Sequence, residues 1–334
     1  MAELRRDILS GRWVITGTKS KQTFFSSLQP KKKIDEKQCP FCLGNEHLTP
    51  SEIFSLREKK SSQWFVRVIP SKEPILEKDR PLEREGVGLY DMMKNTGAHE
   101  LIIETPEHIK NISELSVEQI KKVFYVYQIR MEQLKENNDL RYAIIFKNQR
   151  PNNPYRYGHS HSQLVAFPLT PDIVKNELNN AKEHFSYKER CVFCDIIREE
   201  IRFKQRIIFE NRSVVSFIPF APRFPFETWI VPKRHKADFT KEEQKILVEL
   251  AECLKITLTK ITKLLNDPPL NYMLYSIPYL RPREGYWKTI FQDYHWHIKV
   301  LPHVLPVEGF AWSSGFYIEP LYPEVCAELL REVN

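Results

Sequence analysis

The stretch GHSHSQLVAF, residues 158–167, places two histidines and a glutamine at every second position, directly before an apolar run. Alternate residues of an extended strand share one face, so His159, His161 and Gln163 project together. The two serines between them point to the opposite face. The pattern therefore predicts a strand that gathers three polar groups at one place on a sheet.

The motifs around this strand occur twice along the chain, in the same order. In the first half, CPFC at 39–42 precedes the strand-like ELIIETPEH, a helix that opens with a capping box at Ser116, the β-rich RYAIIFKN and then HSHSQ. In the second half, CVFC at 191–194 precedes FETWIVPKRH, a helix that opens with a capping box at Thr240, the strand NYMLYSIP and then HWHIKVLP. The second copy needs only a loop insertion to match the first.

Each copy combines antiparallel-looking strands with one long helix. The sequence therefore predicts an α+β fold that is built twice, each copy an antiparallel sheet with a long helix. Residues 1–175 form the predicted N-terminal half, which contains CPFC and HSHSQ. Residues 176–334 form the C-terminal half with a second metal site, and a hinge is expected near 168–184.

The composition indicates a globular protein with a mild positive charge. The 334 residues are 42% hydrophobic and 12% aromatic, enough for one large or two medium cores. The net charge of +7 suits an anionic small ligand at least as readily as nucleic acid. The N-terminus has no secretory apolar region and no stretch reaches the roughly 18 apolar residues of a membrane span, so a cytoplasmic protein without a membrane partner is predicted.

Two cysteines at CxxC spacing and two later histidines occur in each half, a set that suits tetrahedral zinc. A reducing cytosol keeps such cysteines as thiols or metal ligands. The predicted ligands are Cys39, Cys42, His108 and His159 at the first site, and Cys191, Cys194, His235 and His295 at the second. Four protein ligands close each site and indicate structural metals, while iron at one site or a glutamate in place of one ligand stays open.

If His159 binds metal, His161 lies one strand step further along the same face and is able to react. A neutral imidazole is a competent nucleophile toward phosphorus, and its product can pass the group to a second acceptor. Gln163 can donate an amide hydrogen to a phosphate oxygen, and Asn148 in IIFKNQ can do so from the neighbouring strand. These three residues are the predicted catalytic set.

Two further histidines, His99 and His297, have other interpretations. His297 follows His295 at the spacing that separates His161 from His159. It is a leftover nucleophile, a metal ligand or a substrate contact, and the sequence does not choose among these. His99 is interpreted as a surface or loop histidine.

HSHSQ preceded by FKNQ, with CPFC upstream and TPEH between them, resembles the galactose-1-phosphate uridylyltransferase family of the histidine-triad superfamily, whose usual signature is HPHPQ. The match covers nearly the whole chain, through ELRRDILSGRWVI, IPFAPRFPFETWIVPKRH, LNDPPLNYM, HWHIKVLP and GFYIEPLYPE. HSHSQ and the second CxxC are most similar to the shorter, ADP-glucose phosphorylase-like branch.

The resemblance implies that both halves are histidine-triad-like units, that residues 1–175 hold the nucleophile and a zinc site, and that the protein uses double-displacement chemistry. A nucleotide sugar gives its nucleoside monophosphate to the histidine that matches His161, sugar 1-phosphate leaves, and the nucleotide passes to a phosphate or sugar phosphate. The family's zinc ligand matches His159, and its phosphate-contacting glutamine matches Gln163. The resemblance also implies a homodimer and, in the uridylyltransferase branch, iron at the second site held by a histidine pair like His295 and His297.

The recognition segments depart from the family pattern. The arginines expected after RWVI are replaced by TGTKSKQT, the asparagine expected after RVI by serine, and the glycine-rich loop before HSHSQ by RPNNPYRY. A glutamate that reads sugar hydroxyls is replaced by alanine, directly after a phenylalanine. The candidate substrate-binding residues in these segments are Lys19, Lys21, Ser71, Arg150, Arg156 and Phe310.

The leading hypothesis is a nucleotidyltransferase with a covalent histidine intermediate. Family frequency favours UDP-glucose:hexose-1-phosphate uridylyl transfer in galactose metabolism. The short chain, the second CxxC and HSHSQ favour the alternative, an ADP-glucose phosphorylase that transfers adenylyl to phosphate, and hydrolysis of a dinucleoside polyphosphate also competes. A second alternative is a non-catalytic, zinc-stabilised nucleotide-binding protein. Nucleic acid is not favoured as a partner.

Overall fold

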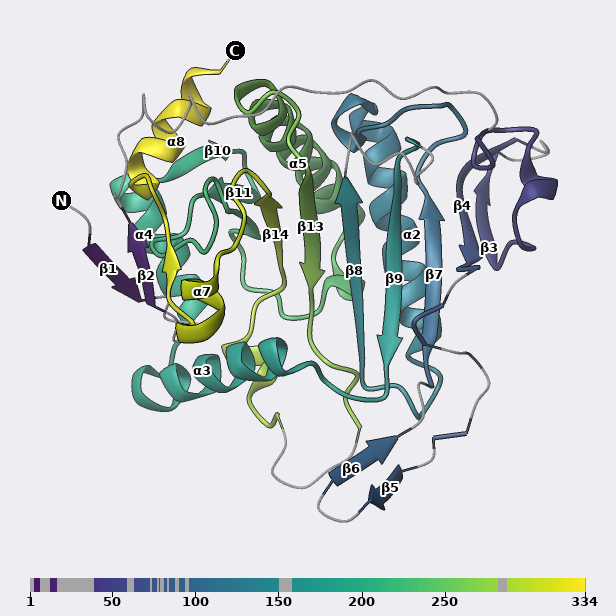
Figure 1. Ribbon diagram of the computed structural model, residues 1–334, viewed down its shortest axis with the longest axis horizontal. Coiled ribbons are helices and arrows are strands. Elements are labelled where there is room, and N and C mark those ends of the chain that lie inside the picture. The colour runs from purple at the N-terminus through teal and green to yellow at the C-terminus, as the bar shows by residue number, and fades with distance from the viewer. Residues whose placement is uncertain are drawn as a thin grey trace.

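A computed structural model describes residues 3–6, 13–16, 39–58, 63–72, 74–76, 78, 81–82, 84–87, 90–93, 96–149, 158–281 and 287–333. Its centre is a ten-stranded sheet in the order β10-β11-β12-β14-β13-β8-β9-β7-β4-β3 (Figure 1). The strands are β3 (Phe54–Arg57), β4 (Trp64–Pro70), β7 (Ala98–Ile103), β8 (Tyr142–Gln149), β9 (His161–Phe167), β10 (Ile207–Glu210), β11 (Val214–Phe217), β12 (Thr228–Pro232), β13 (Leu270–Tyr275) and β14 (His297–Pro302).

The order of strands is that of two copies joined side by side. Outward from the centre, the first half runs β8-β9-β7-β4-β3 and the second half runs β13-β14-β12-β11-β10. Neighbouring strands are antiparallel throughout, including the central pair β8 and β13 that joins the halves. The predicted α+β class and its duplication are therefore confirmed, and the predicted boundary between residues 175 and 176 stays a prediction.

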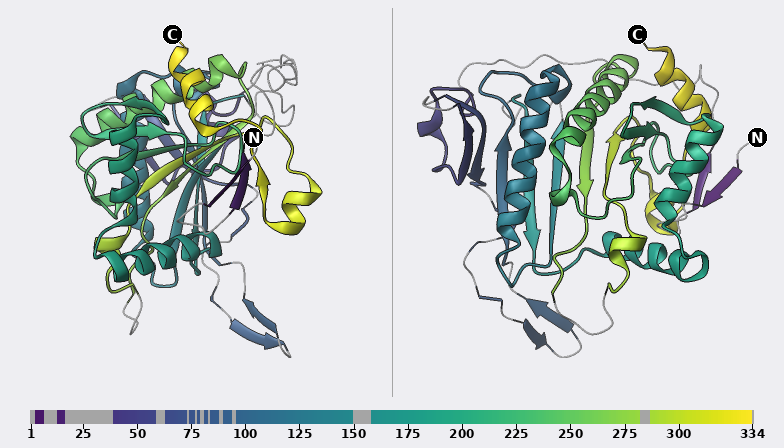
Figure 2. Two further views of the ribbon diagram at one scale, coloured as in Figure 1. Left: turned by 90° about the vertical axis from the view of Figure 1, so that its left-hand side faces the viewer. Right: turned by 180° about the vertical axis from the view of Figure 1, so that it is seen from behind.

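Helices α2 (Val117–Leu134) and α5 (Gln244–Leu264) cover one face of the sheet, one from each half (Figure 2). The other helices are α3 (Asp172–Lys188), α4 (Val192–Phe203), α6 (Ile290–Asp293), α7 (Gly309–Ser314) and α8 (Pro323–Glu332). A three-stranded sheet joins β1 (Glu3–Arg6), β2 (Trp13–Thr16) and β15 (Tyr317–Ile318), and β5 (Arg84–Val87) pairs with β6 (Tyr90–Met93). None of the helices in the described ranges is long and apolar enough to cross a membrane.

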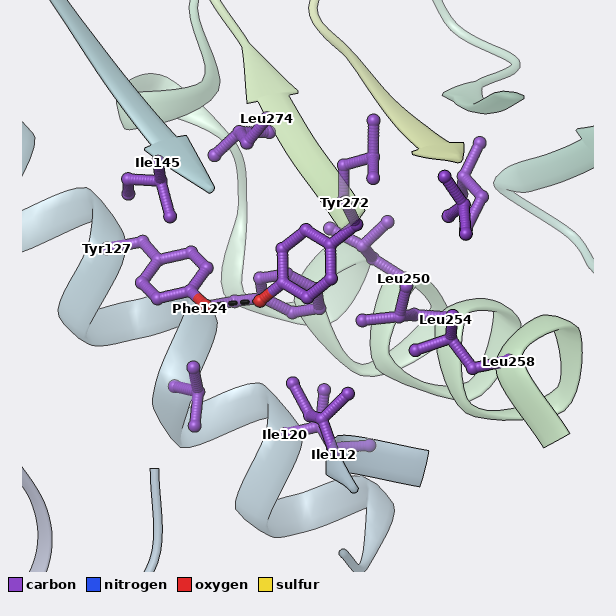
Figure 3. Packing of buried hydrophobic residues seen from close by; sticks show 14 of the residues in the cluster. Ile112, Ile120, Phe124, Tyr127, Ile145, Leu250, Leu254, Leu258, Tyr272 and Leu274 are labelled. Atoms are coloured by element: carbon purple, nitrogen blue, oxygen red, sulfur yellow. Dashed lines mark hydrogen bonds between the residues drawn. The ribbon is translucent and has the colours of Figure 1, made fainter. Parts of the chain in front are cut away.

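The larger core lies between the sheet and these two helices. The α5 side chains that face it recur at three- or four-residue spacing and are fully buried: Leu247, Leu250, Leu254, Leu258 and Ile261. In Figure 3, Tyr127 of α2 and Tyr272 of β13 point toward each other across this core, and their hydroxyls are hydrogen-bonded. Burying so much leucine and isoleucine surface anchors both halves of the sheet to one helical layer.

The predicted start of α2 is confirmed, because Ser116 Oγ accepts the Gln119 backbone N–H at 3.1 Å. The Gln119 side chain does not complete the capping box. Its amide instead donates to the carbonyl oxygens of Phe65 and Glu104, each at 2.7 Å. This bond pattern ties the start of the helix to the ends of two strands.

Two local predictions are wrong. Thr240 does not cap α5, because Asp238 Oδ1 accepts the Thr240 N–H in a short 3₁₀ turn, Phe239–Lys241, and the helix begins at Gln244. The expected hinge at 168–184 is mostly helix α3, which lies below the strands of the second half in the view of Figure 1. An apolar stripe of α3 buries Val174, Leu178 and Ala181, so packing and not linker flexibility governs this segment.

Candidate active site and metal centres

His161 is the first residue of β9 and is half-buried. Its Nδ1 lies 2.8 Å from the backbone carbonyl oxygen of His159. A carbonyl oxygen only accepts hydrogen bonds, so Nδ1 carries the proton and the lone pair of the neutral ring lies on Nε2. The ring of Phe41 packs against the imidazole, with ring centroids 5.4 Å apart. The site therefore holds an imidazole with its lone pair on Nε2, the form in which an imidazole can act as a nucleophile toward phosphorus.

Gln163 lies on the same face of the sheet, two residues after His161. In the register it pairs with Leu101 of β7 and with Phe146 of β8. It is only 8% exposed, and its Oε1 lies 2.9 Å from Nε2 of His99. His99 belongs to strand β7, so its interpretation as a surface or loop histidine is wrong.

The opposite face of the strand carries a buried polar network. Lys147 Nζ lies 2.6 Å from Glu104 Oε2, 2.9 Å from Ser160 Oγ and 3.0 Å from the carbonyl oxygen of His161. Tyr127 OH donates to Ser162 Oγ at 2.6 Å, so both serines point away from the histidine face, as expected. Burial lowers the pKa of Lys147, opposed by the carboxylate of Glu104. The buried ion pair of Lys147 and Glu104 thus holds the backbone of His161 from the opposite face of the strand.

The first predicted metal set converges in space. Ligand atoms of Cys39, Cys42, His108 and His159 all lie within 4.8 Å of one another. Cys39 Sγ is 3.4 Å from His159 Nδ1, and Cys42 Sγ is 3.4 Å from His108 Nδ1 and 3.7 Å from His159 Nδ1. His159 Nε2 donates to the Thr105 carbonyl oxygen at 2.8 Å, which leaves the Nδ1 lone pair directed at the thiols. Burial lowers the His159 pKa to about 4, so the ring is neutral and able to ligate near neutral pH.

The second set has the same construction. Ligand atoms of Cys191, Cys194, His235 and His295 lie within 4.8 Å of one another. Cys194 Sγ is 3.4 Å from His235 Nδ1 and 3.8 Å from His295 Nδ1. Nε2 of His235 donates to the Phe291 carbonyl and Nε2 of His295 to the Pro232 carbonyl, each at 2.9 Å. The hydrogen bond from the Cys191 thiol, with those from the two histidines, lowers the Cys194 pKa and so favours the thiolate that metals bind.

Both sets meet the geometric requirement of a tetrahedral ion. With Zn–S of about 2.3 Å and Zn–N of about 2.0 Å, tetrahedral angles separate a sulfur ligand from a nitrogen ligand by about 3.5 Å. The sulfur–nitrogen separations of 3.4 to 3.8 Å fall around this value. The residues present therefore fit a closed four-ligand metal centre in each half.

Other predicted residues are spread more widely. Asn148 is half-buried and faces the same side as Phe146, and its Oδ1 accepts a hydrogen bond from the Asn271 amide of β13. The other end of the Asn148 amide is its NH₂ group, which is a hydrogen-bond donor. Ser71 follows β4, and its backbone N–H donates to the His99 carbonyl at 2.9 Å. Phe310 lies on α7 and is 49% exposed.

Four candidate substrate contacts cannot be placed. Lys19, Lys21, Arg150 and Arg156 lie outside the described residues.

Three contributors to the site were missed from the sequence. Phe41, inside CPFC, packs on both His159 and His161, and its counterpart Phe193 packs on His295 and His297. The repeated phenylalanine before the second cysteine was a signal for this. The other two, Glu104 and Lys147, are 43 positions apart, and no local pattern joins them.

Comparison with known proteins adds the family. The galactose-1-phosphate uridyl transferase N-terminal domain matches residues 5–171. An ADP-glucose phosphorylase of Arabidopsis thaliana is 33% identical over 339 residues, 99% of this chain and 93% of that protein. The chain belongs to the galactose-1-phosphate uridylyltransferase family. The resemblance drawn from HSHSQ is confirmed.

Two further relatives show how far the similarity extends within the galactose-1-phosphate uridylyltransferase family. A galactose-1-phosphate uridylyltransferase of Thermotoga maritima is 26% identical over 345 residues, 100% of this chain and 99% of that protein. The crystal structure of an Arabidopsis thaliana ADP-glucose phosphorylase with bound ADP-glucose superposes with a TM-score of 0.83 at 30% identity, covering 100% of this chain and 99% of that one. Both branches of the family therefore match over the full length of this chain.

Proposed function

We propose that this chain is a nucleotidyltransferase that works through a covalent nucleotidyl-His161 intermediate and, within the family, acts as an ADP-glucose phosphorylase. The observation that carries the chemistry is the fixed tautomer of His161, which places the lone pair on Nε2. Greater identity to the phosphorylase than to the uridylyltransferase relative supports the adenylyl alternative over uridylyl transfer to a hexose 1-phosphate.

In the first half-reaction, His161 Nε2 attacks the α-phosphorus of ADP-glucose. The P–N bond forms, the bond from the α-phosphorus to the bridging oxygen breaks, and glucose 1-phosphate leaves with that oxygen. The ring becomes cationic, and the His159 carbonyl that accepts its Nδ1–H stabilises this charge. In the second half-reaction, inorganic phosphate attacks the same phosphorus, the P–N bond breaks and ADP is released.

The polar groups on this face act on the phosphate. The amides of Gln163 and Asn148 are placed to donate to phosphoryl oxygens as negative charge grows on them. Ser71 and Phe310, together with Lys19, Lys21, Arg150 and Arg156, are proposed as contacts to the rest of the substrate. These roles rest on position and on the family resemblance.

We infer that both metal centres take zinc, because two sulfur and two nitrogen ligands in tetrahedral arrangement select it over iron. Zinc bound by four protein ligands supplies rigidity and no open position for water. At the first site, Cys39, Cys42, His108 and His159 would hold it, and His159 thereby anchors the strand that begins at His161. The homodimer and the cytoplasmic location remain predictions.

The decisive experiment is trapping. Incubation with ADP-glucose labelled in the α-phosphate is expected to leave acid-labile, base-stable label on the wild type and none on His161→Ala. His297→Ala is the matched control, since it removes a histidine at the equivalent position of the other half and is expected to keep the label. Wild-type protein that stays unlabelled by both ADP-glucose and UDP-glucose supports the non-catalytic alternative.

The same labelled intermediate then identifies the nucleotide donor and the phosphate acceptor. The proposal expects labelling by ADP-glucose in preference to UDP-glucose and discharge of the label by orthophosphate as labelled ADP. Labelling by UDP-glucose, with discharge by galactose 1-phosphate as labelled UDP-galactose, establishes uridylyl transfer instead. Rapid discharge by water alone indicates a hydrolase.

A further inference from the structure

His99 has a hydrogen-bond partner at each ring nitrogen. The backbone N–H of Ile75 donates to its Nδ1 at 3.2 Å, and its Nε2 lies 2.9 Å from Gln163 Oε1. An amide N–H only donates, so Nδ1 is the acceptor and the neutral ring carries its proton on Nε2. That Nε2–H requires an acceptor, so the oxygen end of the Gln163 amide must face His99. The orientation of the amide thus follows from the Ile75 backbone and does not depend on telling oxygen from nitrogen in the amide itself.

The register shows which way the other end of the amide faces. His99 pairs with Val165, Leu101 with Gln163, and Ile103 with His161. Gln163 therefore lies between His99 on one side and His161 on the other along the strand. With its oxygen bonded to His99, the amide directs its NH₂ group away from His99 and toward the reactive histidine.

We infer that His99 is a positioning residue, which fixes the amide of Gln163 so that NH₂, and not the carbonyl oxygen, meets the phosphate. This inference rests on the proposed function. A reversed amide would present a lone pair to an anionic phosphoryl oxygen, and repulsion would replace the hydrogen bond. The pair is also sheltered from competing water, because Gln163 is 8% exposed and His99 is half-buried.

The same histidine secures the segment after β4. The Ser71 N–H donates to the His99 carbonyl at 2.9 Å, while the Ile75 N–H donates to its ring. Ser71 is a proposed substrate contact, so His99 couples the position of a recognition residue to the orientation of Gln163. In the second half, Trp229 pairs with Lys299 as Leu101 pairs with Gln163, so the residue equivalent to His99 is Glu227, directly before β12. Its Oε1 accepts the Trp229 indole N–H at 3.1 Å, and the described residues of that half contain no chain of hydrogen bonds like that of Ile75, His99 and Gln163.

The test compares single-turnover rates of nucleotidylation. His99→Leu removes the donor and is expected to slow labelling of His161 about tenfold, the lower end for loss of a supporting hydrogen bond at a catalytic group. His99→Gln retains an N–H near the Nε2 position and is expected to recover most of the rate. In a Gln163→Ala background, itself about 10²-fold slower, His99→Leu is expected to cause no further loss.

A purely structural role gives a different result. His99→Leu would then slow labelling by the same factor with or without Gln163, and that result, or a His99→Leu variant as fast as the wild type, overturns the inference. Nitrogen-15 NMR of the His99 ring in the resting wild type gives a second measurement that needs no turnover. An Nε2–H tautomer supports the relay and an Nδ1–H tautomer overturns it, whereas failure of the wild type to label rejects the proposed function separately.

Discussion

His161 and His297 occupy equivalent positions at the starts of β9 and β14, and each donates its Nδ1–H to the carbonyl two residues earlier, at 2.8 and 3.0 Å. Each also follows a histidine of a Cys₂His₂ cluster and packs against the phenylalanine of a CxxC pair. Their surroundings differ. His161 is half-buried beside two amide side chains, whereas His297 is completely buried between the rings of Tyr275 and Trp229.

Helix α3 contributes to closing the second position. Its Glu177 forms an ion pair with Lys299, which stands where the first half has Gln163, and its other carboxylate oxygen lies 3.5 Å from His297 Nε2. Burial, reinforced by the Lys299 charge, lowers the His297 pKa well below its usual range. Tautomer and strand position are therefore not sufficient for a nucleophile, because the phosphorus must also be able to reach Nε2. Of the roles left open for His297, the structure favours the leftover nucleophile, which is now buried between the Tyr275 and Trp229 rings.

The sharpest test of this contrast is removal of each ring. His161→Ala is expected to lower the turnover number on the order of 10⁶-fold, the scale seen when a covalent nucleophile is deleted from a catalytic triad. His297→Ala is expected to leave turnover unchanged and to lower the free energy of unfolding by roughly 2–4 kcal/mol, because it opens a cavity in a stacked aromatic cluster. Steady-state kinetics and urea unfolding measure both. Equal loss of turnover in the two variants contradicts the proposed difference between His161 and His297.

The metal centres are expected to behave alike in binding and differently in catalysis. Cys39→Ser and Cys191→Ser are each expected to lose one equivalent of zinc, measured by elemental analysis, and to unfold at lower temperature, because bound metal contributes directly to folding free energy. Only Cys39→Ser is expected to slow the labelling of His161 at a temperature where both variants remain folded. Retention of both metal equivalents in either variant contradicts the ligand sets.

The buried lysines Lys147 and Lys299, one in each half, provide the next test of the difference between the halves. Lys147→Leu is expected to lower the free energy of unfolding by about 3–5 kcal/mol, because it leaves Glu104 buried without its cation. Lys299→Leu does the same to Glu177 in the second half and is the matched control. Both are expected to destabilise in urea unfolding, but only Lys147→Leu removes the bond to the His161 carbonyl and slows labelling. Leucine already occupies the position equivalent to Lys147, at residue 274.

The smallest effect in this comparison of the halves is expected where strands β8 and β13 join them. Asn148→Ala is expected to slow nucleotidylation about 10²-fold, or about 2.7 kcal/mol in activation free energy, by removing one donor to the phosphate. Asn271→Ala, which removes only the partner of the Asn148 oxygen, is expected to cost less. Rapid-quench labelling measures both rates. A greater loss in Asn271→Ala than in Asn148→Ala means that the β8–β13 strand pair affects the site through its backbone and not through the Asn148 amide.

Local patterns in the sequence predicted what depends on neighbouring residues. Alternation in HSHSQ correctly separated the histidine face from the serine face, and Ser116 marked the true start of α2. The same reasoning failed at Thr240, where a nearby aspartate offered a competing acceptor. It failed again at the expected hinge, where α3 packs against the second half through a buried apolar stripe. At Thr240 a residue just before the expected capping box decided the outcome, whereas at the expected hinge a tertiary contact did.

The sequence by itself determined the duplication, the two Cys₂His₂ sets, the paired histidines and the family, because spacing and alternation are properties of the chain alone. Only the tertiary structure decided that His161 is accessible while His297 lies under α3, and that Ile75, His99 and Gln163 form one line of hydrogen bonds. These arrangements join residues 24 to 120 positions apart. The physical reason is that such pairings are selected by the burial and hydrogen bonding of the whole fold, and no local propensity encodes them.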